Sequence, residues 1–335
     1  MKKMSYVCVV VSIVLMGLLF LPLSGTASAK EIKLYWASFL PKNIPETKDF
    51  QTLFVDKVNE RAKGKLKIIY RGGPEAIPPT DLGNATQKGI IDMCSTTVGW
   101  YESVVPGVGA LMLSDYTPQE ERANKAFMDY VEKLHADHGL YWLGRSAPTK
   151  NNFFYIFLNK KVEKPEDFKK MMLGVATAAR AAAKAWGATI TPVKISDYFT
   201  AMERKMVDGI PGCPITTWVA LGCQEVTKYV LDYQFYQGTA TALMNLKSWN
   251  KLPDDLKKLM YDTMGEFYAA RMDAAARRVE GAEKKMKDMG IEFYKFKNPK
   301  DGEWLMKTTY DAGWKYQHDR FPEVTDQLEK FLRKQ

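Results

Sequence analysis

Strand-like and helix-like patterns alternate along the first hundred residues, and few folds accommodate that alternation. Ile32 to Phe39, Leu66 to Tyr70 and Ile90 to Thr96 are rich in β-branched and aromatic residues. Between these strands, apolar residues recur at helical spacing from Phe50 to Ala62, and Asp81 to Lys88 is a short helical stretch. Strands that alternate with helices predict parallel βαβ units, and therefore an α/β fold.

The alternation continues in the second part of the chain. Further strands are predicted at Phe153–Leu158 and Thr189–Val193, and helices at Gln119–Ala136, Ala178–Trp186 and Tyr198–Met206. One long amphipathic helix is predicted from Asp254 to Met289, because Pro253 precedes it and Gly290 follows it. Two α/β halves and a long late helix predict two lobes around a hinged cleft, with the helix bracing both lobes.

The N-terminus has the pattern of a secretory signal peptide. Lys2 and Lys3 precede an apolar run from Val7 to Leu21, and Ala27-Ser28-Ala29 supplies small residues for cleavage. The run is shorter than the roughly 20 residues of a membrane-spanning helix, so an uncleaved anchor is the weaker alternative. We therefore expect a mature chain that begins near Lys30 and resides in the periplasm.

The expected organisation follows from these segments. It comprises a signal peptide at 1–29, lobe I at 30–150 plus about 240–300, lobe II at 151–239, and a C-terminal helical segment at 301–335 that packs on the lobes. The formal net charge is +9, but basic residues are interspersed with acidic ones. This pattern indicates a solvated surface and argues against nucleic-acid binding.

The sequence contains no convincing catalytic or metal-ligating set, and no cofactor is expected. His135 and His138 lie one helical turn apart without an obvious third ligand, which favours a polar helix face over a metal site. Beyond the signal segment the cysteines are Cys94, Cys213 and Cys223. A disulfide between Cys213 and Cys223 stays open as an alternative in an oxidising compartment.

Aromatic and arginine residues near predicted strand ends are better candidates for a binding site. Ligands of α/β sheets bind beyond the carboxyl ends of strands, where Trp36, Phe39 and Trp100 are expected, and Trp218 lies near a further turn. For each aromatic residue, core packing is the alternative. Two arginines are candidates for gripping an acid group. They are Arg145, in a predicted loop after Gly144, and Arg180, at the start of an alanine-rich helix, where a solvated side chain is the alternative.

Short motifs follow one another in a characteristic order over nearly the whole mature chain. They are Gly64-Lys65-Leu66, Gly89 to Met93, Pro165 to Lys169, Gly187-Ala188 before Pro192-Val193, Val207-Asp208-Gly209, Glu225 to Tyr229, Met244-Asn245, Trp249 and Leu252-Pro253-Asp254. In this order they resemble the extracytoplasmic solute receptors of tripartite ATP-independent periplasmic (TRAP) transporters, the dicarboxylate-receptor family. The resemblance implies a two-lobed fold that closes on an organic anion and delivers it to a membrane permease driven by an ion gradient.

The chain departs from that family at the positions that grip the ligand carboxylate. Where members carry a ligand arginine, this chain has Gly174, and a second such position matches Phe154. Asp208-Gly209 is followed by Ile210-Pro211-Gly212, where the family has a polar pair. Losing the buried arginine would leave a carboxylate unpaired, so we expect Arg180 to replace it, with Arg145 as second choice.

The sequence therefore predicts a non-catalytic, monomeric periplasmic receptor of a TRAP-type importer. The expected aromatic wall at Phe154 and empty space at Gly174 favour an aromatic or indolic acid, while a compact carboxylate or sulfonate stays open. The candidate ligand-binding residues are Trp36, Phe39, Trp100, Arg145, Phe154, Gly174, Arg180, Cys213, Trp218 and Asn245. The alternatives are a secreted α/β enzyme acting on small organic acids and a solute-sensing module for a membrane signalling protein.

Overall fold

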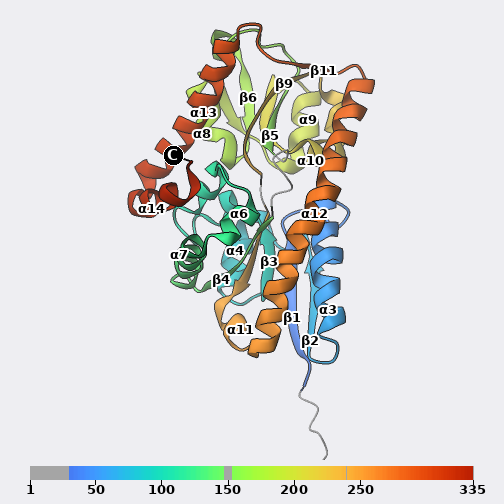
Figure 1. The fold of residues 1–335 in the computed structure, drawn as a ribbon. Coiled ribbons are helices and arrows are strands. Elements are labelled where there is room, and N and C mark those ends of the chain that lie inside the picture. The colour runs from blue at the N-terminus through green and yellow to red at the C-terminus, as the bar shows by residue number, and fades with distance from the viewer. Residues whose placement is uncertain (1–29, 147–152, 239, 335) are drawn as a thin grey trace, which may run out of the picture. The chain divides into compact units, whose positions relative to one another are not determined.

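Two β-sheets organise the chain, as the computed structural model in Figure 1 shows. The structure describes residues 30–146, 153–238 and 240–334, so the predicted signal peptide lies outside the described residues. The chain divides at Glu31, and the fold below is that of the unit Ile32–Gln335. We call the first sheet with its helices lobe I and the second sheet with its helices lobe II.

The sheet of lobe I has the strand order β2-β1-β3-β10-β4. Its strands are β1 (Ile32–Ser38), β2 (Leu66–Gly72), β3 (Met93–Thr96), β4 (Leu140–Ser146) and β10 (Ala240–Asn245). β1 pairs in parallel with β2 and β3, and Trp36 lies opposite both Tyr70 and Met93. β10 runs antiparallel between β3 and β4, so a segment from late in the chain completes the first sheet.

The sheet of lobe II has the strand order β11-β9-β5-β8-β6-β7. Its strands are β5 (Phe153–Leu158), β6 (Met172–Val175), β7 (Thr189–Pro192), β8 (Gly209–Cys213), β9 (Tyr229–Gln237) and β11 (Glu292–Tyr294). β5 is antiparallel to β8 and β9, whereas β6 is parallel to β7 and β8. The predicted α/β character is confirmed, with mixed rather than purely parallel sheets.

Helices surround both sheets. Those from the first part of the chain are α2 (Pro45–Phe50), α3 (Asp56–Arg61), α4 (Leu82–Gln87), α5 (Val98–Tyr101), α6 (Pro118–Ala123) and α7 (Lys125–Ala136). Those from later parts are α8 (Arg180–Ala185), α9 (Tyr198–Glu203), α10 (Ile215–Ala220), α11 (Leu246–Asn250), α12 (Asp254–Asp288), α13 (Pro299–Arg320) and α14 (Pro322–Leu332). The helix predicted at Gln119–Ala136 is interrupted at Asn124, whose side chain accepts a hydrogen bond from Phe127 N and caps α7.

The long helix α12 contributes side chains to the cores of both lobes. Met260 and Phe267 pack among lobe I residues, whereas Val279 and Met286 pack among lobe II residues. The predicted long bracing helix is therefore confirmed. β11 follows α12 and pairs with β9, so the chain passes from lobe I to lobe II within α12 rather than near residue 300.

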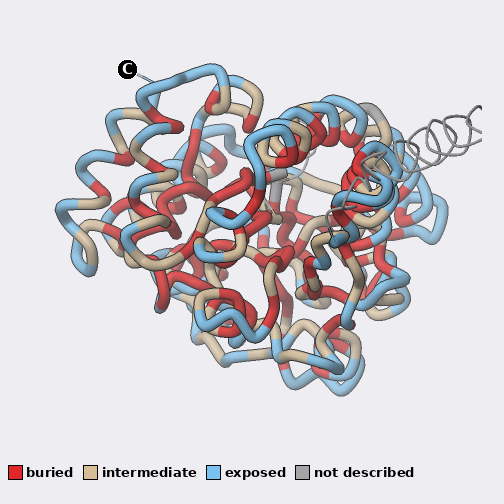
Figure 2. Tube along the Cα trace, turned by 90° about the horizontal axis from the view of Figure 1, so that it is seen from below, coloured by how far each residue is buried: buried red, intermediate tan, exposed pale blue. Residues whose placement is uncertain are grey.

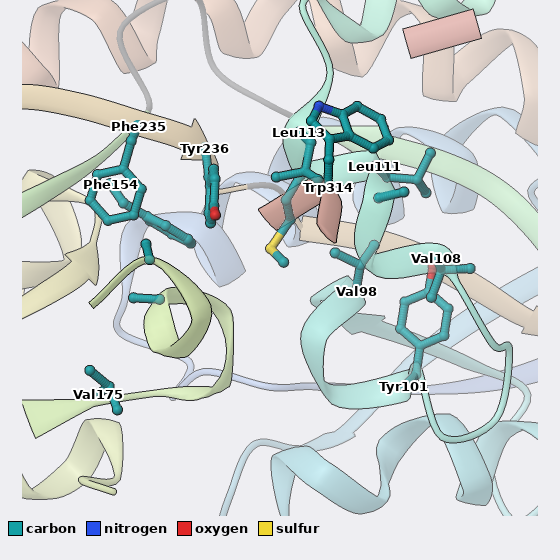
Figure 3. Close-up of a cluster of buried hydrophobic side chains, with 14 of the residues drawn as sticks. Val98, Tyr101, Val108, Leu111, Leu113, Phe154, Val175, Phe235, Tyr236 and Trp314 are labelled. Carbon is teal, nitrogen blue, oxygen red and sulfur yellow. The ribbon is translucent and has the colours of Figure 1, made fainter. Parts of the chain in front are cut away.

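A further apolar cluster connects the lobes through the C-terminal helices (Figure 3). It joins Tyr101 and Leu111 of lobe I to Phe154 and Phe235 of lobe II, and Trp314 of α13 packs with them. In Figure 2 the buried positions lie on the inner sides of the elements and the exposed ones on their outer turns. Among the described residues, no helix combines the length and apolar character that crossing a membrane requires.

Candidate functional site

A cavity lies between the two lobes, with about 710 Å³ of empty space when the solvent at its mouth is included. Its walls include segments that directly follow strands. Phe39 comes after β1, Thr97 after β3 and Ala176 after β6. The cavity therefore lies where the parallel parts of the sheets end, as expected for an α/β protein.

Aromatic side chains form apolar walls on both sides of the cavity. On the lobe I side, Phe39 and Trp100 make an edge-to-face contact with ring centroids 5.4 Å apart. On the lobe II side, Phe154 is held by Phe235, with centroids 6.0 Å apart. Paired rings of this kind are fixed in orientation, so the walls suit a flat apolar ligand.

Among the described residues that line the cavity, the basic one is Arg271, which was not predicted from the sequence. It lies in α12 with 3% of its surface exposed, and its Nε lies 3.4 Å from Asp49 Oδ2. Arg278 donates to the same carboxylate, with Nη1 3.2 Å from Oδ1. Asp49 thus interacts with both guanidinium groups beside the cavity, and a guanidinium group at a cavity wall is suited to binding an anion.

The sequence does contain a signal for Arg271. Met260, Met264 and Phe267 follow the buried stripe of α12 at spacings of four and three residues. Arg271 is the next position of that stripe, four residues on. A charged residue at a position that should be buried is uncommon unless it is paired, so it marks a functional candidate.

A carboxylate also lines the cavity. Glu46 lies in the first turn of α2, and its Oε1 accepts hydrogen bonds from the hydroxyls of Thr216 and Thr217, each at 3.3 Å. Both threonines lie in α10, so this carboxylate links lobe I to lobe II beside the cavity. Its Oε2 is buried without a hydrogen-bond partner in the described parts of the chain.

Four of the predicted site residues line the cavity, namely Phe39, Trp100, Phe154 and Cys213. Burial raises the pKa of the Cys213 thiol well above its usual value, so the thiol stays protonated. Cys213 and Cys223 are both free, and the disulfide left open by the sequence is absent. Cys213 is therefore a neutral part of the wall.

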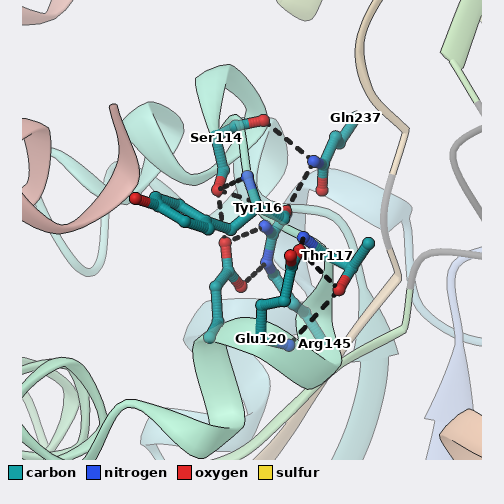
Figure 4. A network of polar contacts seen from close by, with 7 residues as sticks. Ser114, Tyr116, Thr117, Glu120, Arg145 and Gln237 are labelled. Atoms are coloured by element: carbon teal, nitrogen blue, oxygen red, sulfur yellow. Dashed lines mark hydrogen bonds and ion pairs between the residues drawn. The ribbon is translucent and has the colours of Figure 1, made fainter. Parts of the chain in front are cut away.

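The two predicted arginines lie outside the cavity lining. Arg145 is in strand β4 rather than a loop, and 1% of its surface is exposed. Its Nε donates to Glu121 Oε2 at 2.7 Å, and its Nη2 pairs with the other carboxylate oxygen. Figure 4 shows this network, in which Gln237 donates to the carbonyl oxygens of Ser114 and Tyr116. The arginine charge is thus matched within lobe I, which corrects the expectation of a cleft residue.

Arg180 is the first residue of α8 and is exposed. The neighbouring Ala179, Ala182 and Ala183 form the buried face of this segment. Because these alanines pack against lobe II, Arg180 lies on the solvent side and not in the cavity wall.

Gly174 also differs from the expectation of empty space. A Cβ at this position would lie 2.9 Å from Val193 Cγ2 and 3.2 Å from Ile210 Cγ1. The space next to this position is filled by the lobe II side chains Val193, Val207 and Ile210. The position is therefore part of the packed sheet.

The remaining predicted residues have structural surroundings. Trp36 is fully buried against Phe50 and Tyr70 in lobe I. Trp218 stacks on Phe157 with centroids 4.1 Å apart, and its Nε1 donates to Thr227 Oγ1 at 2.9 Å. Asn245 caps α11 and donates to the carbonyl oxygens of Thr86 and Gln87. None of these three side chains lines the cavity.

His135 is a buried structural residue of lobe I. Its Nδ1–H donates to the Val131 carbonyl at 2.7 Å, and its Nε2 accepts from the Tyr101 hydroxyl at 3.1 Å. Burial lowers the pKa of His135 to about 4, so the ring is neutral at pH 7. Across the described residues, no group of three or more His, Cys, Asp and Glu side chains is arranged to hold a metal ion.

Comparison with known families finds one model that covers most of the chain. Residues 36–316 match the family described as bacterial extracellular solute-binding protein, family 7. An uncharacterized protein of Haemophilus influenzae is 31% identical over 120 residues, which cover 35% of this chain and 36% of that protein. The ectoine-binding periplasmic protein TeaA of Halomonas elongata is 24% identical over 210 residues, which cover 60% of each chain. The matches thus span less than two thirds of these two curated relatives.

Solved structures of similar fold match almost end to end. A TRAP periplasmic solute-binding protein of Desulfovibrio salexigens with bound orotic acid has a TM-score of 0.78 at 17% identity, covering 90% of this chain and 97% of that one. A Bordetella pertussis extracytoplasmic solute receptor binding pyroglutamic acid has a TM-score of 0.77 at 15% identity, covering 90% and 99%. An apo open structure from Marinobacter aquaeolei has a TM-score of 0.78 at 14% identity, covering 90% and 100%.

Proposed function

The chain belongs to family 7 of the bacterial extracellular solute-binding proteins, and from this premise we propose that it is a TRAP-type receptor for a flat, ring-bearing organic acid. The family and the structural neighbours are solute-binding receptors and not enzymes, so the secreted-enzyme alternative is excluded. The remaining question is which class of solute the cavity accepts.

The observation that carries the proposal is the combination of Arg271 with aromatic walls at one cavity. An acid group next to Arg271 would gain a charge-assisted hydrogen bond in a mostly apolar site. A ring between Trp100 and Phe154 would be in contact with apolar surface from both lobes. In this arrangement Arg271 replaces the arginines that the family carries at the positions of Phe154 and Gly174.

The charge distribution argues against a small aliphatic dicarboxylate. Glu46 lines the same cavity as Arg271, and it would repel a second carboxylate. The similar folds that bind orotic acid and pyroglutamic acid support a ligand with one acid group on a ring. The proposal therefore retains the aromatic or indolic class that the sequence favours and assigns it one acid group.

A ligand panel tests the proposed class. The purified receptor is titrated by calorimetry with the ring acids indole-3-acetate and orotate, and with the aliphatic diacids succinate and malate. We expect the ring acids to bind and the diacids to bind at least tenfold more weakly, because the diacids leave the aromatic walls uncovered. A response confined to the diacids would overturn the proposal.

Delivery to a permease completes the proposed role. Glu46 links α2 to α10, so ligand binding between the lobes is coupled to contacts that hold them together. We propose a monomeric receptor in the periplasm that carries its ligand to an ion-driven membrane permease. Uptake of labelled ligand into vesicles that contain the partner permease would be observed only with the receptor present, whereas a solute-sensing module would give no uptake.

A further inference from the structure

Glu46 is a charged group of the cavity wall, with surroundings that differ from those of Arg271. It contributes one carboxylate from α2, while the aromatic rings Phe39 and Trp100 lie on the same lobe. The wall facing the ligand is otherwise mostly apolar, because Phe154, Cys213 and Pro214 form much of the lobe II side. A carboxylate in such a wall determines which ligands the cavity accepts, since the apolar side chains around it do not solvate it.

The hydrogen bonds of Glu46 are incomplete. Oε1 accepts from both Thr216 and Thr217 at 3.3 Å, which is long for hydroxyl donors. Oε2 is buried and has no partner in the described parts of the chain. A carboxylate oxygen accepts more than one hydrogen bond, and leaving it without any when buried is unfavourable. The interlobe contact therefore leaves one oxygen unpaired.

We infer that the ligand carries, besides its acid group, an N–H donor that hydrogen-bonds to Glu46 Oε2. This inference rests on the proposed function, and it adds a requirement to the ring-bearing acid. The acid group faces Arg271 and the N–H group faces Glu46, so the two charges of the cavity each meet a complementary group. The chemistry is shared by a neutral ring N–H and by an ammonium group.

Glu46 also contributes to specificity by exclusion. An acid of the same shape without an N–H group would bury the carboxylate with Oε2 still unpaired. A site built to accept a donor rejects an analogue that lacks it, because the buried acceptor then loses its partner. The selectivity for a donor is therefore expected to depend on Glu46, and the overall affinity on the aromatic walls and Arg271.

Two matched ligand pairs test the inference by calorimetry. The first is indole-3-acetate against 1-methylindole-3-acetate, which differ in a neutral ring N–H. The second is phenylalanine against 3-phenylpropionate, which differ in an ammonium group. In at least one pair we expect the donor-bearing member to bind at least tenfold more tightly, and the pair that shows this difference identifies the kind of donor.

The variant Glu46→Gln tests whether the difference in affinity within a ligand pair depends on this side chain. It keeps the size of the side chain but removes its charge, and we expect the ratio of affinities within the discriminating pair to fall to about threefold or less. Thr217→Val is the matched control, because it removes an interlobe hydrogen bond of Oε1 and leaves the carboxylate in place. It is expected to weaken both members of a pair by the same factor.

The outcomes separate the inference from the function on which it rests. Equal affinities within both pairs, or a difference that persists in Glu46→Gln, would overturn the inference while the ring-acid function stands. If no acid of either pair binds but the aliphatic diacids do, both the function and the inference are overturned. Circular dichroism of each variant shows whether it has folded, and Thr217→Val supplies a second folded variant for comparison.

Discussion

Arg145 and Arg271 are both almost fully buried, with 1% and 3% of their surface exposed, yet their surroundings differ. Arg145 lies within lobe I, where Glu121 pairs with two of its nitrogens. Arg271 lines the cavity and shares Asp49 with Arg278. In the first region one arginine pairs with one carboxylate, and in the second two arginines share one carboxylate beside the cavity. The comparison shows that burial alone does not distinguish the two arginines, whereas their positions and carboxylate partners do.

The largest expected effect comes from breaking the matched pair. Arg145→Met removes one partner of a pair that is almost completely buried and leaves Glu121 charged without compensation. We expect the free energy of unfolding to fall by about 3–5 kcal/mol, measured by urea denaturation. The double variant Arg145→Met/Glu121→Leu should recover most of that loss, because it buries no unpaired charge. Equal instability of the single and double variants would show that the pair is not the cause.

Arg271→Met tests the second region. Asp49 retains Arg278, so we expect a smaller loss of stability than in Arg145→Met. The affinity for a ring acid should instead fall about a hundredfold, because the acid group loses its positive partner. Arg180→Met is the matched control, since Arg180 is exposed and outside the cavity lining. The affinity of this variant for a ring acid should be unchanged. An affinity loss in Arg180→Met with none in Arg271→Met would reverse the assignment.

A smaller effect on the stability of lobe I is expected from the buried side chain of His135. Its folded-state pKa is about 4, below the usual value of 6.5, because burial disfavours the charged ring. Between these values the unfolded chain binds a proton that the folded chain does not, so stability falls as pH decreases through this window. From pH 7 to pH 5 we expect this residue to account for a loss of about 2 kcal/mol.

The variant His135→Gln lacks the titrating ring and should lose that part of the pH dependence. Urea denaturation at pH 7 and pH 5 for both proteins gives the difference. If the stability of His135→Gln falls by as much as that of the parent chain, another group is responsible for the pH dependence.

Much of the fold could be predicted because local patterns reflect burial directly. The apolar stripe from Leu256 to Phe267 predicts the long helix, and Pro253 marks its start. The strand at Ile32–Ser38 likewise follows from its β-branched and aromatic residues. The break at Asn124 was not predicted, because α6 and α7 are separated by this single residue, whose backbone conformation ends α6 and whose side chain caps α7. The pairing of β11 with lobe II was not predicted either, since strand partners far apart in sequence leave no local pattern.

The candidate site could be predicted only in part. Phe39, Trp100 and Phe154 line the cavity because they lie on or near strand ends, a feature visible in the sequence. Arg271 and Glu46 were not selected, because each lies in a helix whose position relative to the cavity depends on how the lobes pack. The sequence made Arg145 a candidate ligand residue because it does not reveal the partner of this arginine. That partner, Glu121, lies 24 residues earlier in the chain, and only the tertiary structure brings the two side chains together.

By itself, the sequence determined the α/β class, the presence of two lobes, the long helix that contacts both lobes, and the family. These follow from periodicity and motif order, which are local properties of the chain. Only the tertiary structure decided which charged residues line the cavity, because a charge acts through its nearest partners and these come from distant segments. It matched Arg145 with Glu121 inside lobe I, and it placed Arg271 and Glu46 in the wall of one cavity between the lobes.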